Sequence, residues 1–132
     1  MDNFKLVESG KMGRVAYGRI APNEDVVLGV EKLCLAQGFN NAFVRGALGS
    51  LVDACIEVQK GETIQIKGPA VEIVSLAGEV RSNESGTPCA SLTGVVAGPD
   101  GNVYGGKFVL GLNPICVTFE VTLEEWLPDP SA

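Results

Sequence analysis

The chain has no histidine among its 132 residues. Histidine is the most frequent general base of enzyme sites and the commonest metal ligand in proteins. A Ser-His or Cys-His catalytic pair within one chain is therefore excluded. The glycine-rich loop that cradles phosphates is also missing, because no Gly-x-x-x-x-Gly-Lys-Ser/Thr motif occurs. These absences favour a protein that is not an enzyme and carries no cofactor.

Targeting and redox motifs are missing as well. No apolar run approaches the roughly 20 residues that cross a membrane, and Met1 to Lys5 do not begin a signal peptide. No Cys-x-x-Cys pair is formed by the four cysteines, which are Cys34, Cys55, Cys89 and Cys116. We therefore expect a cytoplasmic protein with four buried, reduced thiols and no contact with a membrane.

Positive charge is scarce, with 10 basic against 16 acidic residues and a net charge of −6. An acidic chain gains no general attraction to a phosphate backbone, which argues against DNA binding by this domain alone. The length indicates a single domain over residues 1–132 with a core at about 13–128.

One helix is predicted, at about residues 24–37. Asn23 is a suitable N-cap, and apolar residues recur at helical spacing from Val26 to Cys34. Gly38 is a typical C-terminal stop.

The rest of the chain reads as about seven strands. The predicted strands are Gly13–Ala21, Ala42–Leu48, Thr63–Lys67, Val71–Arg81, the two arms of a hairpin around Gly98–Gly101, and Ile115–Glu124. Leu51–Gln59 is predicted to follow Ala42–Leu48 as another extended piece. Val71–Arg81 is apolar on both faces in places, which predicts a central, covered strand. We expect the segment from Trp126 onward to lie over the surface. The fold class is therefore α+β, a mainly antiparallel sheet with one main helix, whose edges and uncovered face are free to pack against copies of the chain.

Several local motifs occur in a distinctive order. They are Glu24-Asp25-Val26 at the start of the helix, Asn41–Leu51 ending in Gly-Ser-Leu, Val71–Gly78, and the hairpin Gly98–Gly106. In this order and at these intervals the chain resembles the PPC (plants and prokaryotes conserved) domain, from Arg14 to about Pro128. The resemblance implies a compact domain that assembles as a homotrimer. Stand-alone bacterial and archaeal members are often described as candidate DNA-binding proteins.

The resemblance also bears on metal binding. Prokaryotic members often have a His-x-His pair before the hairpin and a third histidine after its Gly-Gly. These positions correspond here to Ser91, Thr93 and Lys107. Hydroxyls and a protonated amine are poor zinc ligands, so we expect no metal. The Lys107 ammonium would then lie near the metal position, and we expect it to pair with Glu72, Glu79 or Asp53.

Two functions follow, with a third that is less supported. The first is a non-catalytic, homotrimeric interaction module. The alternative is a site for a small anionic ligand, or an enzymatic site, at a subunit interface. Lys107 and Arg45 would orient the anion, and Ser91 and Thr93 would hydrogen-bond it. Catalysis would have to use Glu79, Glu72 or Lys107 as acid or base. Gly105 and Gly106 mark where the backbone comes close. The third is DNA binding, although the chain has no AT-hook motif of the plant proteins.

Overall fold

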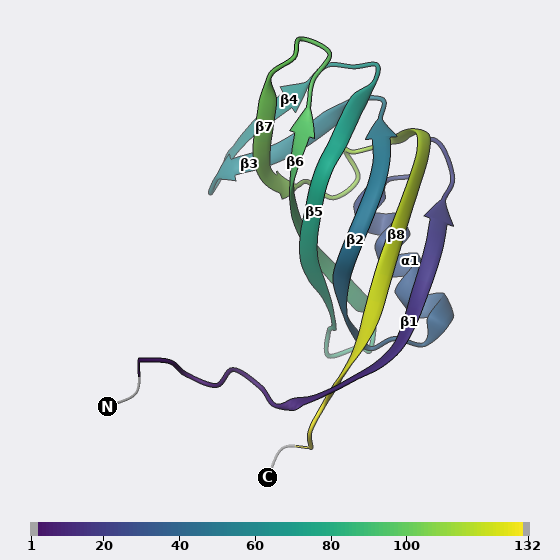
Figure 1. Ribbon diagram of the computed structural model, residues 1–132, viewed down its shortest axis with the longest axis vertical. Coiled ribbons are helices and arrows are strands. Elements are labelled where there is room, and N and C mark those ends of the chain that lie inside the picture. The colour runs from purple at the N-terminus through teal and green to yellow at the C-terminus, as the bar shows by residue number, and fades with distance from the viewer. Residues whose placement is uncertain (1–2, 131–132) are drawn as a thin grey trace.

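The computed structural model describes residues 3–130, which form one helix and a single eight-stranded sheet (Figure 1). Neighbouring strands are antiparallel throughout, and their order is β1-β8-β2-β5-β6-β7-β3-β4. The elements are β1 (Gly10–Ile20), α1 (Val26–Gln37), β2 (Asn41–Leu51), β3 (Ala54–Gln59), β4 (Glu62–Ile66), β5 (Val71–Ser82), β6 (Pro88–Ala97), β7 (Val103–Phe108) and β8 (Ile115–Pro128). The predicted α+β class is confirmed.

The helix begins two residues later than expected. Asn23 is not its N-cap, because the backbone of Asn23 is left-handed, with φ of 72°. Asp25 caps the helix instead, and its Oδ2 accepts a hydrogen bond from the Leu28 amide at 3.0 Å. The C-terminal stop at Gly38 is confirmed by its left-handed φ of 73°.

One strand assignment and the expectation for the C-terminal segment were wrong. The expected strand Leu51–Gln59 is divided, because β2 ends at Leu51 and β3 begins at Ala54. The segment from Trp126 was expected to lie over the surface, but β8 continues to Pro128 and Trp126 pairs with Met12 of β1. The last two residues of that segment, 131–132, lie outside the described residues. The Trp126 ring also packs edge-on against Phe43, at 5.9 Å between ring centroids.

The hydrophobic core lies between α1 and one face of the sheet (Figure 1). Its largest fully buried side chains include Phe39, Leu51, Leu92, Phe119 and Leu123. β5 is central as predicted, but only one of its faces is covered: Val71 and Val80 are buried whereas Val74 is exposed. A single helix of 12 residues cannot cover both faces of eight strands.

Two of the four thiols that were predicted to be buried are buried in the structure. Cys34 and Cys55 are buried, but Cys116 is partly exposed and Cys89 is exposed, and all four are free. Burial raises the pKa of the Cys34 thiol to about 11, which makes it unreactive at neutral pH. Within residues 3–130, no helix is long and apolar enough to cross a membrane.

Candidate functional site

The face of the sheet that points away from α1 carries most of the predicted site residues, and we call it the open face. Side chains alternate between the two faces of a strand. Leu92 and Phe108 point into the core, so Ser91, Thr93 and Lys107 point to the open face. The exposed apolar side chains of the open face are Val15, Tyr17, Leu48, Val74 and Val103.

The three positions that correspond to the family histidines converge on this face. Thr93 of β6 lies directly opposite Lys107 of β7. Ser91 is two residues along β6 and faces the same way, opposite Glu79 of β5. Two hydroxyls and an ammonium do not fit a zinc ion. Across residues 3–130, moreover, no group of three or more His, Cys, Asp or Glu side chains is placed to hold a metal.

Lys107 is not paired as expected. No carboxylate lies within 4.0 Å of its ammonium in the part of the chain that the structure describes. Glu79 instead pairs with Arg81 at 3.0 Å, and Asp53 accepts a hydrogen bond from the Gly68 amide at 2.9 Å. The prediction was wrong because Lys107 is exposed, and a hydrated ammonium needs no partner.

A shallow pocket of about 470 Å³ lies on the open face. It is lined by Phe43, Gly78, Glu79, Ser91 and Thr93. The structure therefore brings Ser91, Thr93 and Glu79 together. Arg81 contacts one of the lining residues, with its guanidinium 5.6 Å from the centre of the Phe43 ring.

Arg45 does not line this pocket. It is the extra residue of a bulge in β2, and its Nε lies 3.3 Å from Glu124 of β8. The partner of Arg45 is thus a carboxylate on the neighbouring strand of the same chain.

A second cavity, of about 400 Å³, was not expected from the sequence. It lies where β7 diverges from β6, because these strands pair only from Thr93 onward. Glu31 of α1 reaches the free strand edge there, and its Oε2 accepts a hydrogen bond from the Ala90 amide at 2.8 Å. Lys107 and the exposed Cys89 border the same cavity. No sequence signal places Glu31 beside Ala90, since that contact depends on how the helix packs.

The two glycines of the hairpin differ in their surroundings. A Cβ on Gly106 would lie 2.6 Å from the Glu57 carbonyl oxygen of β3, which no real side chain tolerates. A Cβ on Gly105 would have no neighbour nearer than 3.7 Å. Close backbone approach is confirmed at Gly106, where it serves strand packing.

Carboxylates neutralise the arginines of this molecule. Each of the four arginines has a carboxylate oxygen within 4.0 Å, in the pairs Arg14–Glu125, Arg19–Glu120, Arg45–Glu124 and Arg81–Glu8. Glu120 also accepts a 2.6 Å hydrogen bond from the Tyr17 hydroxyl, which raises the pKa of Tyr17 and lowers the pKa of Glu120.

The sequence matches the model of the Plants and Prokaryotes Conserved (PCC) domain over residues 7–127. The chain belongs to the PCC domain family. This is the PPC family that the motifs indicated. No curated protein sequence matches the chain.

Solved structures support the same fold. A PPC protein of Pyrococcus horikoshii is 21% identical, with a TM-score of 0.78 over 95% of this chain and 87% of that one. A metal-containing protein of Archaeoglobus fulgidus is 24% identical, with a TM-score of 0.75 over 95% and 88%. A candidate DNA-binding protein of Bacteroides thetaiotaomicron is 14% identical, with a TM-score of 0.73 over 92% and 96%. At these identities the likeness concerns the fold alone.

Proposed function

We propose that this PCC-domain protein is a non-catalytic interaction module of the cytoplasm that acts as a homotrimer joined through its open face. The single observation that carries the proposal is the apolar surface of that face. Leu48 is 52% exposed and Val74 is 59% exposed, on two adjacent central strands. Side chains of this kind on central strands are normally covered. Four free thiols suit a reducing compartment.

Sedimentation velocity over a range of concentrations tests the homotrimer. We expect the parent to sediment as a trimer and Leu48→Lys to sediment as a folded monomer, because a lysine on the open face would be desolvated in the interface. Leu35→Lys is the matched control, since Leu35 is 64% exposed on the helix, away from that face. A parent that stays monomeric at every concentration would contradict the proposal.

The DNA-binding hypothesis gains little from the structure. Arginine is the residue that most often reads bases and clamps phosphates, and all four arginines already have carboxylate partners. Binding to DNA would break these pairs within a molecule of net charge −6.

A second candidate function is the binding of a small anion beside Lys107. It is favoured by the position of an ammonium without a carboxylate partner in residues 3–130, directly opposite the Thr93 hydroxyl. Phosphate titration followed by NMR should shift the amides of Ser91, Thr93 and Lys107 in the parent but not in Lys107→Met. Lys11→Met, an exposed position on β1 at the opposite edge of the sheet, should behave like the parent. Equal shifts in Lys107→Met would exclude this site.

A further inference from the structure

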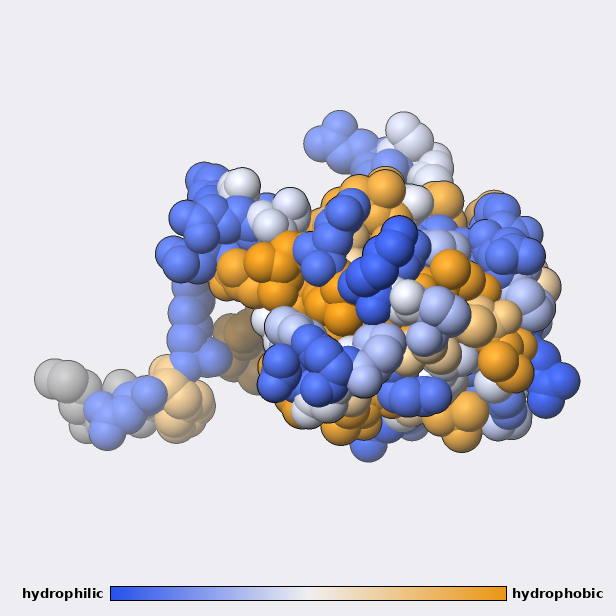
Figure 2. Space-filling model, turned by 90° about the horizontal axis from the view of Figure 1, so that it is seen from above, coloured by the Kyte–Doolittle hydropathy of each residue, from blue (hydrophilic) through white to orange (hydrophobic). Residues whose placement is uncertain are grey.

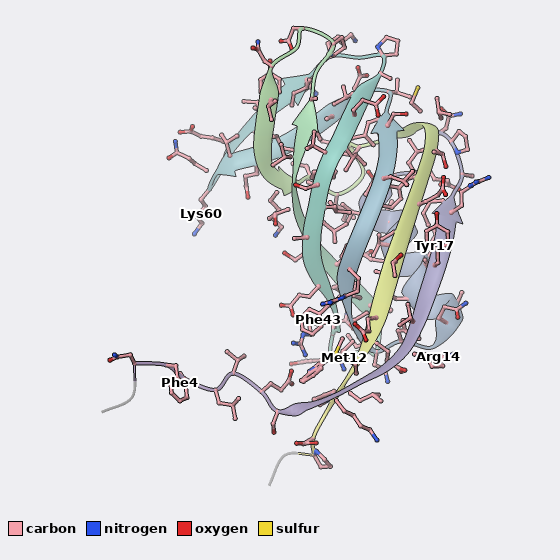
Figure 3. All side chains as sticks on the ribbon, in the orientation of Figure 1. Phe4, Met12, Arg14, Tyr17, Phe43 and Lys60 are labelled. Carbon is pink, nitrogen blue, oxygen red and sulfur yellow. The ribbon has the colours of Figure 1, made fainter. Side chains whose placement is uncertain are left out.

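The residues before β1 form an extended arm, residues 3–7, that leaves the body of the molecule (Figure 1). Its apolar side chains are among the most exposed in the chain: Phe4 is 79%, Leu6 is 70% and Val7 is 92% exposed. Phe4 points away from the rest of the structure (Figure 3), and apolar atoms of the arm stand clear of the body when it is seen from above (Figure 2). Within residues 3–130, no hydrogen bond or ion pair involves residues 3–7.

The residues at the base of the arm, Glu8 and Ser9, are nevertheless held by hydrogen bonds. Glu8 accepts hydrogen bonds from the indole of Trp126 and from Arg81, the latter at 2.9 Å. Ser9 donates to the Asp129 carboxylate at 2.9 Å, and the Asp129 amide donates back to the Ser9 carbonyl at 2.9 Å. These bonds set the direction in which the arm departs. Three exposed apolar side chains on a segment whose direction is fixed by hydrogen bonds at its base are typical of a surface that another molecule covers.

The base of the arm also connects the arm to the open face. Arg81, which holds Glu8, stacks over Phe43 and pairs with Glu79, and both of these residues line the open-face pocket. The arm is therefore continuous with the surface through which we propose that subunits associate. Fully extended, its five residues span about 17 Å, enough to cross a subunit boundary.

We propose that the arm of each subunit docks on the open face of a neighbouring copy of this chain, where Phe4 and Leu6 pack against its exposed apolar side chains. Phe4 and Leu6 lie on the same side of an extended segment and form one apolar edge, with Lys5 on the other side. In a closed ring each subunit gives one arm and receives one. This inference rests on the proposed homotrimer, which it deepens by naming the segment that joins the subunits.

The double variant Phe4→Ser/Leu6→Ser tests the proposal by sedimentation velocity. We expect the dissociation constant of the assembly to rise at least about tenfold, because two apolar side chains lose their buried environment. Lys5→Ser controls for the arm, and Val58→Ser, at an exposed apolar position of β3, controls for loss of surface hydrophobicity. Melting of the dilute monomer should not change, since the arm contacts little of its own subunit.

The outcomes separate the two proposals. A double variant that associates as tightly as a trimeric parent overturns the docked arm and leaves the homotrimer standing. A parent that is monomeric at all concentrations overturns both.

Trypsin gives a second readout without substitution, because Lys5 is a cleavage site within the arm. We expect cleavage after Lys5 to slow at least about tenfold when the protein is concentrated enough to assemble, since a protease needs an unpacked segment. Cleavage at equal rates in the assembled and the dilute protein would overturn the proposal.

Discussion

Asp25 joins two parts of the fold through one carboxylate. Its Oδ2 caps α1 at the Leu28 amide, and its Oδ1 accepts a hydrogen bond from the buried Asn113 amide at 2.8 Å. We expect Asp25→Ala to lower the free energy of unfolding by about 2–4 kcal/mol, since it removes a helix cap and leaves a buried amide without its partner. Urea denaturation measures this loss. Glu24→Ala, at the exposed neighbouring position, should change stability by less than about 0.5 kcal/mol, and equal effects would argue against the cap.

The Tyr17–Glu120 hydrogen bond makes a prediction about pH. The bond favours the protonated phenol, so the folded-state pKa of Tyr17 lies above its ordinary value of 10.0. Its contribution to stability is complete below that ordinary pKa and is lost as pH rises through the folded-state pKa. The pKa of Glu120 is lowered from 4.5, chiefly by the Tyr17 hydrogen bond, so its contribution is lost as pH falls through the folded-state pKa.

Absorbance titration of tyrosinate can check the alkaline side. In a Tyr104→Phe background, which leaves Tyr17 as the one tyrosine, we expect titration above pH 10.0. Adding Glu120→Ala should return the midpoint toward that value. An unchanged midpoint would show that the carboxylate does not set the pKa.

Because Ser91, Thr93 and Lys107 lie side by side, replacing all three by histidine should create a metal site. Ser91, Thr93 and Lys107 share one face, with Thr93 and Lys107 directly opposite each other. We expect the triple histidine variant Ser91→His/Thr93→His/Lys107→His to be stabilised by zinc in a thermal melt, because three imidazoles would converge there. The parent and the matched triple alanine variant should not respond. A histidine variant indifferent to zinc would show that the three side chains do not converge.

At the scale of elements, the pairing of β7 with β3 requires that position 106 have no side chain. A Cβ at Gly106 would press on the Glu57 carbonyl oxygen at 2.6 Å, whereas a Cβ at Gly105 would meet nothing nearer than 3.7 Å. We expect Gly106→Ala to destabilise the fold by about 1–3 kcal/mol, as overpacked substitutions do. Gly105→Ala should leave the isolated subunit within about 0.5 kcal/mol of the parent. Thermal melts of the two variants compare them directly, and similar losses would contradict the close approach.

At the scale of the whole molecule, charge pairing predicts poor DNA binding. We expect no binding of a short duplex in fluorescence anisotropy even at low salt, because the net charge is −6 and all four arginines have carboxylate partners. A variant that frees three of them, Glu120→Gln/Glu124→Gln/Glu125→Gln, should bind weakly and lose this binding as salt rises. Tight, salt-sensitive binding by the parent would restore the DNA hypothesis.

Much of the fold could be predicted because its signals are local. The Gly38 stop, the Gly98–Gly101 turn and the alternation of Phe119–Glu124 each depend on a few neighbouring residues, and each lies where expected. The predicted alternation fails at Val117, which is 71% exposed where the register between β8 and β2 shifts. The predicted N-cap was wrong because Asn23 and Asp25 are both good N-cap residues in sequence. Only the structure shows that the backbone of Asn23 is left-handed and that the helix therefore begins after Asp25.

The candidate site was only partly predictable. The family motifs correctly placed Ser91, Thr93 and Lys107 on adjacent strands. The partner of Lys107 could not be read from spacing, since carboxylates distant in sequence compete for every cation and solvent exposure decides whether any is needed.

By itself, the sequence determined that no imidazole is available as a base or as a metal ligand, because the chain has no histidine. It also determined the type of most elements, because periodicity and turn residues act over a few positions. Only the tertiary structure decided that β8 continues through Trp126 beside β1, that Arg45 and Arg81 are neutralised, and that one sheet face stays open. The reason is physical: pairing between residues more than 100 positions apart, as for Met12 and Trp126, depends on the burial available to the whole chain.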